Sequence, residues 1–204
     1  MLSSGILCNG PPKAATHLLL RIIQLFGAIR RNGLVKEQGC LYKAQHKWRP
    51  RLWVENHIRG YCMPSHVPYD SRYKNPLTIT ILRDPRNILI SRYRKLTPKY
   101  SLIEIIQRSQ NRRACLDCYD GYLEDKNFPV FFFEQIIANP ATELIRIKQL
   151  IQSNRDVDYV HENMIGPEFT GHWSDWKEYL TPEINEAFIR HGIHKLAKRW
   201  GYEE

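Results

Sequence analysis

The sequence lacks a long apolar run and an even set of cysteines. Its first apolar stretch, Ile6-Leu7-Cys8, leads directly into Asn9-Gly10-Pro11-Pro12 and is too short for a signal peptide or a membrane span. The five cysteines are an odd number scattered along the chain, which argues against a disulfide-rich secreted scaffold. We therefore expect a cytoplasmic protein with reduced thiols and no transmembrane segment.

The sequence also lacks internal repeats, low-complexity segments and a strong metal site. Cys115 and Cys118 form one C-x-x-C pair, but no second pair lies at zinc-site spacing. We interpret them as two thiols on one helical face, without a metal. No recognised nucleic-acid-binding motif accompanies the interleaved basic and aromatic residues from Lys43 to Arg72. Nucleic acid is therefore not the expected partner.

The composition is that of an ordinary globular domain. The 204 residues are 43% hydrophobic and 25% charged, so we expect one domain, residues 1–204, that folds alone. Thirty Lys plus Arg against 21 Asp plus Glu give a formal net charge of +9, which favours anionic partners such as nucleotides. The sequence does not indicate an oligomeric state.

Short apolar runs alternate with longer amphipathic patterns, the signature of an α/β domain. The expected strands are Ser4–Asn9, Pro76–Leu82 and Val130–Phe133. The helices expected to follow them are His17–Arg30, Arg86–Arg94 and Pro140–Ile151. The segment 34–72 has weak periodicity, so we interpret it as a lid or an acceptor-binding excursion rather than core.

The loop Gly10–Thr16 joins the first expected strand to the first expected helix. It contains small residues, Lys13 and the hydroxyl of Thr16, and such a turn aims backbone N–H groups and the positive end of a helix at a phosphate. The Gly-Lys-Ser/Thr ending of a Walker A loop is missing, and Lys13 precedes the small residues instead of following them. An ATP-binding loop is thus disfavoured.

The segment Pro12-Lys13-Ala14-Ala15-Thr16-His17 resembles the first loop of the sulfotransferase family, Pro-Lys-Ser-Gly-Thr-Thr. In that family the loop grips the 5′-phosphosulfate end of 3′-phosphoadenosine 5′-phosphosulfate (PAPS). The proline, the lysine and the first threonine match, whereas Ala14, Ala15 and His17 replace serine, glycine and the second threonine. The resemblance implies that the cofactor is bound by Pro12, Lys13, Ala14, Ala15, Thr16 and His17.

A second segment, Ile79 to Tyr93, looks like the family's other nucleotide signature. There an arginine that ends a strand and a serine on the next helix hold the 3′-phosphate, and Arg83 and Ser91 occupy these positions. A guanidinium offers a planar fork of donors to a phosphate, and a hydroxyl can add one more. The alternative interpretation is that Arg83 and Asp84 only cap the helix.

Two later segments extend the resemblance. Val130 to Ile136 is similar to the family's strand ending in Tyr-Glu-Asp, with Phe133 in place of the tyrosine, so an aromatic contact to adenine is implied. Gly171 to Thr181 is similar to the family's closing segment, and Gly171 is implied to bind the cofactor. The Arg-Lys pair that precedes this glycine in the family is Phe169-Thr170 here.

The candidate catalytic base is His66. Pro64-Ser65-His66-Val67-Pro68 is similar to the Lys-Thr-His-Leu-Pro segment of cytosolic members, with His66 on the catalytic histidine and Pro64 in place of the lysine. An imidazole can take the acceptor hydroxyl proton as the new S–O bond forms. A structural role for His66 stays open, and His17 and Glu55 are the alternative bases.

These segments occur in the family's order and cover most of the chain. The resemblance implies a single three-layer α/β domain with a mainly parallel central sheet, a P-loop-like nucleotide-binding fold. It also implies transfer of a sulfuryl group from PAPS to a hydroxyl of a small-molecule or glycan acceptor, with Lys13 and His66 as catalytic residues and no metal. The alternatives are a nucleotide- or nucleic-acid-binding module without catalysis and a P-loop kinase.

Overall fold

The computed structural model describes residues 5–30, 61–66, 68–69, 71, 77–109, 115–166 and 175–203. Within these residues a five-stranded sheet has the order β2-β3-β1-β4-β5, and every adjacent pair of strands is parallel. The strands are β1 (Ile6–Asn9), β2 (Ile29–Arg30), β3 (Tyr61–Pro64), β4 (Leu77–Leu82) and β5 (Val130–Phe132). A parallel sheet connected by helices confirms the expected α/β class.

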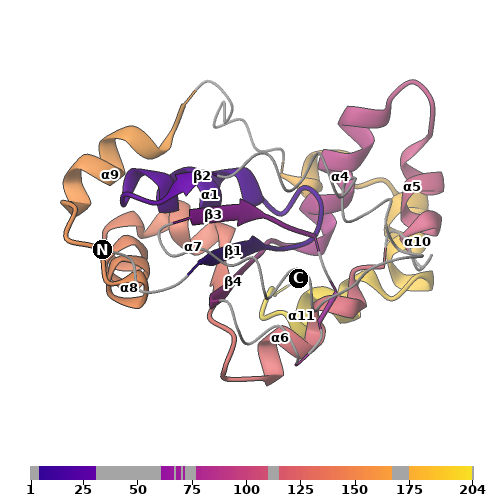
Figure 1. Cartoon of the computed structure of the whole chain (residues 1–204). Helices are drawn as coiled ribbons and strands as arrows, with labels where there is room; N and C mark the ends of the chain where they lie inside the picture. The colour runs from indigo at the N-terminus through magenta and orange to yellow at the C-terminus, as the bar shows by residue number, and fades with distance from the viewer. Residues whose placement is uncertain are drawn as a thin grey trace.

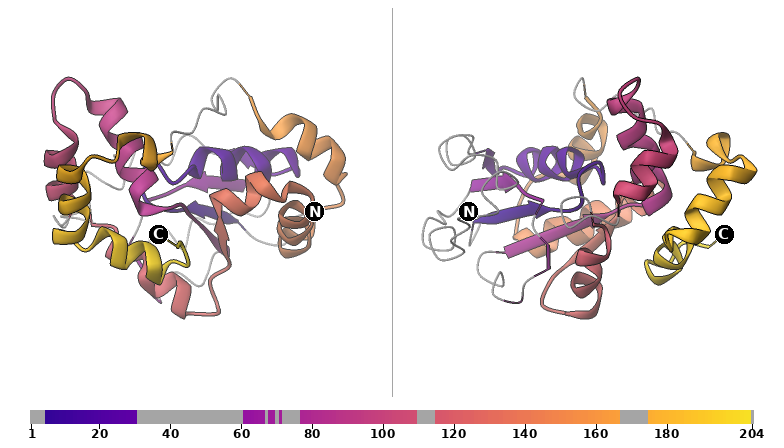
Figure 2. Two further views of the ribbon diagram at one scale, coloured as in Figure 1. Left: turned by 180° about the vertical axis from the view of Figure 1, so that it is seen from behind. Right: turned by 90° about the vertical axis from the view of Figure 1, so that its right-hand side faces the viewer.

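Helices surround this sheet. The α-helices are α1 (Thr16–Leu25), α4 (Pro85–Leu96), α5 (Leu102–Arg108), α6 (Asp120–Glu124), α7 (Phe133–Ala138), α8 (Pro140–Ile151), α9 (Val157–Met164), α10 (Pro182–Arg190) and α11 (Ile193–Arg199). The described 3-10 helices are η2 (Asp117–Tyr119) and η3 (Trp176–Tyr179). Figure 1 shows α8 and α9 toward one end of the sheet and α4, α5 and α10 toward the other, and the reversed view in Figure 2 shows the same separation. In the described part of the chain, every helix is too short or too polar to span a lipid bilayer.

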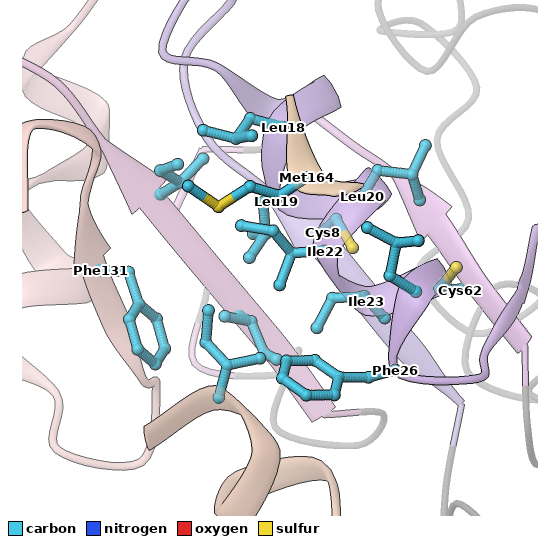
Figure 3. Close-up of a cluster of buried hydrophobic side chains, with 14 of the residues drawn as sticks. Cys8, Leu18, Leu19, Leu20, Ile22, Ile23, Phe26, Cys62, Phe131 and Met164 are labelled. Carbon is cyan, nitrogen blue, oxygen red and sulfur yellow. The ribbon is translucent and has the colours of Figure 1, made fainter. Parts of the chain in front are cut away.

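The sheet carries a hydrophobic core on each face. In β1, Ile6 and Cys8 belong to one core and Leu7 to the other, as the alternation of side chains along a strand requires. The core of Ile6 is completed by α1, α7, α8 and α9, and Figure 3 shows Met164 beside Leu18 and Leu19 of α1. The core of Leu7 is completed by α4, α5, α6, α10 and α11. Helices on both faces give the expected three layers.

Local sequence signals set several helix starts. Asp84 caps α4 by accepting a hydrogen bond from the Arg86 N–H (2.8 Å). Pro85 occupies the first helical position, where its missing N–H leaves no helical bond unmade. Thr181 caps α10 by accepting a hydrogen bond from the Ile184 N–H (3.3 Å).

Several element boundaries differ from the predicted ones. The helix predicted to run to Arg30 ends at Leu25, because Gly27 adopts a φ of 106° and the chain turns into β2. The strand predicted to include Phe133 ends at Phe132, and Phe133 begins α7.

Part of the segment that we interpret as an excursion belongs to the sheet. Tyr61–Pro64 forms β3 and pairs with β1 and β2, so the interpretation of 34–72 as lid rather than core is wrong for these residues. The sequence Tyr-Cys-Met-Pro has no alternation of β-branched residues, which explains why this strand is not predicted. Residues 34–60 lie outside the described residues.

Candidate active site

The carboxyl ends of β1 and β4 form a topological switch point. After β1 the chain passes through α1 to β2, whereas after β4 it passes to β5 on the opposite side of the sheet. Open α/β sheets bind ligands at such a reversal, beyond the carboxyl ends of the strands. The loop Gly10–Ala15 follows β1 and Arg83 follows β4, so both lie at this edge (Figure 1).

The loop after β1 has a strained backbone. Lys13 and Ala15 have positive φ values of 79° and 70°, a region that costs a non-glycine residue roughly 1–2 kcal/mol. Ala14 lies between them, fully buried, and its N–H donates to the Pro11 carbonyl oxygen (2.9 Å). Such strain persists only where surrounding contacts fix it, and it is frequent at functional sites.

Gly10 brings the start of this loop against β4. A Cβ at Gly10 would lie 2.3 Å from the Ile81 carbonyl oxygen, and the φ of 154° also favours glycine. Ala15 ends the loop as the residue that precedes α1. The N-terminus of α1, which is the positive end of the helix dipole, therefore lies at the same edge of the sheet as Arg83. Helix N-termini bind anions, so this end of α1 suits a phosphate.

Lys13 lies among other cations. Burial lowers the pKa of the Lys13 ammonium, and the charges of Lys95 and Arg83 lower it further. Lys13 is therefore close to Lys95 of α4 and to Arg83, which follows β4. Cations that converge from the loop, from β4 and from α4 create a positive potential suited to a polyanion.

Arg83 is buried, with 7% of its surface exposed. Its guanidinium carbon lies 4.8 Å from the centroid of the Phe133 ring, and its Nε lies 4.0 Å from Glu134 Oε1. The Nε atom is buried and has no hydrogen-bond partner. Because a buried N–H without a hydrogen-bond partner is costly, Arg83 is a candidate ligand-binding group.

The neighbouring Asp84 has a different partner. Its carboxylate accepts hydrogen bonds from Arg86, with Nε 3.0 Å from Oδ1 and Nη2 2.8 Å from Oδ2. Arg86 also lies 4.1 Å from the centroid of the Trp176 ring and donates to the Glu203 carbonyl oxygen (2.8 Å). Asp84 and Arg86 are therefore the structural pair of this turn, and the cap does not require Arg83.

His66 is hydrogen-bonded to the loop after β1. Its Nδ1 lies 2.7 Å from the Gly10 carbonyl oxygen, which can only accept, so Nδ1 carries the proton and Nε2 is the acceptor of the neutral ring. Burial lowers the pKa of His66, the Gly10 contact opposes this effect, and the charges of His17 and Arg92 reinforce it. His66 is therefore neutral at neutral pH and can accept a proton at Nε2.

The chain is anchored on both sides of His66. Before it, the Ser65 N–H donates to the Cys8 carbonyl oxygen (2.8 Å), which continues the pairing of β3 with β1. After it, the Tyr122 hydroxyl donates to the Pro68 carbonyl oxygen (3.2 Å). These contacts fix the position of the imidazole relative to the loop.

Phe133 contacts Arg83, and Ser91 lies on the helix that follows Arg83. Phe133 is 3% exposed and its ring faces the Arg83 guanidinium, so it supports that side chain, while its adenine contact stays a prediction. Ser91 is half-buried on α4, one helical turn before Lys95, on the same face of the helix. The charge of Lys95 affects the pKa of Lys13 in the loop after β1.

The other predicted site residues differ in their exposure. Pro12 is half-buried in the loop, Thr16 is buried at the start of α1, and His17 is exposed one residue later. His17 lies close enough to His66 for its charge to affect the imidazole. Gly171 and the alternative base Glu55 lie outside the described residues.

Further residues of the site carry little signal in the sequence. They are Arg92, Lys95, Glu134 and Tyr202. Lys95 could have been found from its spacing to Ser91 on the helix after Arg83. Tyr202 could not, because its hydrogen bond to Glu134 joins segments that are distant in the sequence.

The C-x-x-C pair differs from its interpretation. η2 begins at Asp117, so Cys115 and Cys118 do not share a helical face, and the Cys118 thiol donates to the Cys115 carbonyl oxygen (3.1 Å). Burial raises the pKa of Cys118 to about 12, which keeps its thiol protonated at neutral pH. Within the described ranges, no three or more His, Cys, Asp and Glu side chains gather in a way that could hold a metal ion.

No protein-family profile matches this sequence, and no curated protein matches it at a significant level. Solved structures do match its fold. Mouse sulfotransferase SULT7A1 complexed with PAP, adenosine 3′,5′-bisphosphate, has a TM-score of 0.65 at 16% identity, over 92% of this chain and 82% of that chain. Retinol dehydratase in a complex with retinol and PAP has a TM-score of 0.60 at 9% identity, over 91% of this chain and 79% of that chain. Retinol dehydratase in complex with androsterone and inactive cofactor PAP has a TM-score of 0.61 at 9% identity, over 92% and 79%.

These neighbours define the class of fold. The chain has the P-loop-like α/β fold of the PAPS-dependent sulfotransferases, as the sequence motifs implied. The low identities mean that the likeness is one of architecture, so the chemistry has to be argued from the side chains at the switch point.

Proposed function

We propose that this protein is a cytoplasmic sulfotransferase that transfers a sulfuryl group from PAPS to a hydroxyl of a small-molecule acceptor. The observation that carries the proposal is the convergence of Lys13, Arg83 and His66 at the carboxyl edge of the sheet, each from a different strand end. The sulfotransferase fold supports the same conclusion.

The residues at the switch point fit the two anionic ends of PAPS. Lys13, the loop backbone and the positive end of α1 suit the 5′-phosphosulfate end. The buried Arg83 Nε, which has no hydrogen-bond partner, suits the 3′-phosphate, and Ser91 adds a hydroxyl. Ala15 adopts the left-handed conformation that glycine favours, so the replacement of the family's glycine adds strain but does not prevent the turn.

The proposed mechanism assigns separate tasks to His66 and Lys13. When bound, PAPS would supply the sulfuryl group, with PAP as the leaving group. His66 takes the proton of the acceptor hydroxyl at Nε2, because the bond to Gly10 holds the other ring proton at Nδ1. Lys13 stabilises the negative charge that develops on the leaving oxygen. This scheme needs no metal ion.

The acceptor class is proposed from the ligands of a neighbour. Retinol dehydratase has been solved with retinol and with androsterone, and both ligands are small molecules that carry a hydroxyl group. The cytoplasmic location is proposed from the thiols, because Cys8, Cys115 and Cys118 form no disulfide within the described residues.

The test is transfer of radiolabelled sulfate from PAPS to a panel of alcohols, phenols, steroids and glycans. We expect label on at least one acceptor and none with the double variant Lys13→Ala/His66→Asn. A parallel thermal-shift series uses PAP, adenosine 5′-phosphate and ATP at equal concentration. Stabilisation by PAP without any sulfuryl transfer would indicate a nucleotide-binding module without catalysis. Selective stabilisation by ATP would indicate a kinase. Either result would contradict the proposal.

A further inference from the structure

Glu134 links the turn that carries Arg83 to the C-terminal segment. Its Oε1 accepts a hydrogen bond from the Asp84 N–H (3.2 Å) and lies 4.0 Å from Arg83 Nε. Its Oε2 accepts a hydrogen bond from the Tyr202 hydroxyl (2.6 Å). One carboxylate therefore connects the end of β4, the start of α7 and the residues after α11.

The Tyr202 hydroxyl is held in place by packing around it. Its ring packs edge-on against Phe132, with centroids 5.9 Å apart and planes at 81°. The next residue, Glu203, accepts a hydrogen bond from the buried Arg86 through its carbonyl oxygen (2.8 Å). The C-terminal segment is thus docked beside the Arg83 turn, and it presents the hydroxyl to Glu134 in a fixed position.

The contacts around the carboxylate of Glu134 favour its ionised form. Burial raises the pKa of Glu134, and the hydrogen bond from Tyr202, the backbone donors and the charge of Arg83 oppose that rise. The Phe133 ring lies against the Arg83 guanidinium and Glu134 lies beside its Nε, so both restrict its orientation. A planar fork of donors recognises a phosphate well only when its plane is fixed.

We propose that Tyr202 and Glu134 are positioning residues that orient Arg83 toward the 3′-phosphate and thereby set the preference for nucleotides that carry one. The identity of the ligand rests on the proposed function. The hydrogen bonds and the ion pair that form the linkage do not.

The experiment is calorimetry of PAP and of adenosine 5′-phosphate binding to the full chain and to its variants. In Tyr202→Phe we expect the ratio of the two affinities to fall about tenfold, the effect of losing one hydrogen bond to a charged group. The affinity for adenosine 5′-phosphate should stay near its original value, because that ligand lacks the group that Arg83 would hold.

Trp200→Phe is the matched control. Trp200 anchors the same segment by donating from Nε1 to Asp120 Oδ1 (2.7 Å), and it does not bond to Glu134. A general loosening of the C-terminal segment would alter this variant as well, whereas the positioning role predicts that its affinity ratio matches that of the unmodified protein.

Glu134→Gln separates positioning from charge. Removal of a negative charge beside Arg83 would by itself raise the affinity for PAP, while loss of orientation lowers it. A fall of the ratio in Tyr202→Phe and Glu134→Gln, with Trp200→Phe unchanged, supports the inference. An unchanged ratio in Tyr202→Phe, a rise in Glu134→Gln or an equal fall in Trp200→Phe overturns it. If the unmodified protein binds both nucleotides equally, the proposed 3′-phosphate site is itself wrong.

Discussion

Lys13 and Arg83 follow different strands, yet the charge of Arg83 reaches Lys13 and lowers its pKa. Like charges held close together cost stability, and a bound anion with a charge at each end would offset that cost. His66 lies next to the same loop but is kept neutral, so one edge of the sheet holds both cations for an anion and an acceptor for a proton.

Lys13→Ala should slow sulfuryl transfer by about a hundredfold or more, the effect of removing one preorganised donor to a developing charge. The measurement is turnover at saturating PAPS, together with a urea unfolding curve that checks the fold. Lys126→Ala, at an exposed lysine in the turn before β5, is the control and should keep the original rate. Near-normal turnover in Lys13→Ala would remove Lys13 from the mechanism.

His66→Asn should lower the rate by roughly a hundred to ten thousandfold, the usual contribution of a general base, with the affinity for PAP almost unchanged. Paired assays of turnover and PAP binding measure this. If His66→Asn retains the original rate, the base lies elsewhere, and the same assays would then be applied to His17 and Glu55.

The environment of His66 also predicts the pH dependence of transfer. Burial depresses the pKa of the imidazole, so the neutral form persists as the pH falls and the acidic limb of kcat/KM should lie below the ordinary histidine value of about 6.5. Arg92→Gln removes a nearby positive charge that lowers this pKa, so it should move the limb upward. A limb at or above the ordinary value in the unmodified protein would contradict this assignment.

The sequence motifs placed Lys13 and Arg83 after expected strands, and the structure has both there. His66 also follows a strand, β3, but the sequence analysis placed it in an excursion. Their chemical roles stay predictions. The linkage between Glu134 and Tyr202 could not be predicted, because a contact between distant segments leaves no local pattern. The sequence also did not show which arginine forms the ion pair with Asp84, because Arg83 and Arg86 are both close enough along the chain.

Among the elements, the loop between β1 and α1 shows how the chain departs from the family's motif. Ala15 keeps a left-handed backbone where the family has glycine, while Ala14 has its methyl group fully buried in the core. Substitution by glycine should therefore change the free energy of unfolding in opposite directions at Ala14 and Ala15.

Ala15→Gly should raise the free energy of unfolding by up to about 1 kcal/mol, because glycine adopts a positive φ without strain. The greater conformational entropy of glycine in the unfolded chain offsets only part of this stabilisation. Ala14→Gly should lower the free energy of unfolding by about 1 kcal/mol or more, since it removes a buried methyl group and adds backbone freedom. Urea unfolding midpoints measure both. Equal shifts of the same sign would show that the backbone at Ala15 is not strained.

The predictability of the strands follows from their composition. β4 reads Leu-Thr-Ile-Thr-Ile-Leu, a β-rich run that was predicted within one residue of its observed start. β2 has two residues and β3 reads Tyr-Cys-Met-Pro, so neither has a periodic signal. Their pairing with β1 depends on the whole fold, which local patterns do not record.

In the molecule as a whole, two cores cover the two faces of the sheet, and the loops of the candidate site extend from its carboxyl edge. The architecture persists at identities of 9–16% to the neighbours, because a core requires apolar residues of suitable volume more than particular ones. The proposed chemistry, in contrast, depends on particular side chains at the switch point, namely Lys13, Arg83 and His66.

The central claim is that Arg83 binds the 3′-phosphate while the loop after β1 binds the 5′ end. Its most direct test is calorimetry of PAP and of adenosine 5′-phosphate binding to the unmodified protein and to Arg83→Ala. We expect the unmodified protein to prefer PAP. We expect Arg83→Ala to weaken PAP binding roughly tenfold to a hundredfold, as loss of hydrogen bonds from a charged donor would, with little change for adenosine 5′-phosphate. Equal losses for both ligands would contradict the account and leave Arg83 with a structural role only.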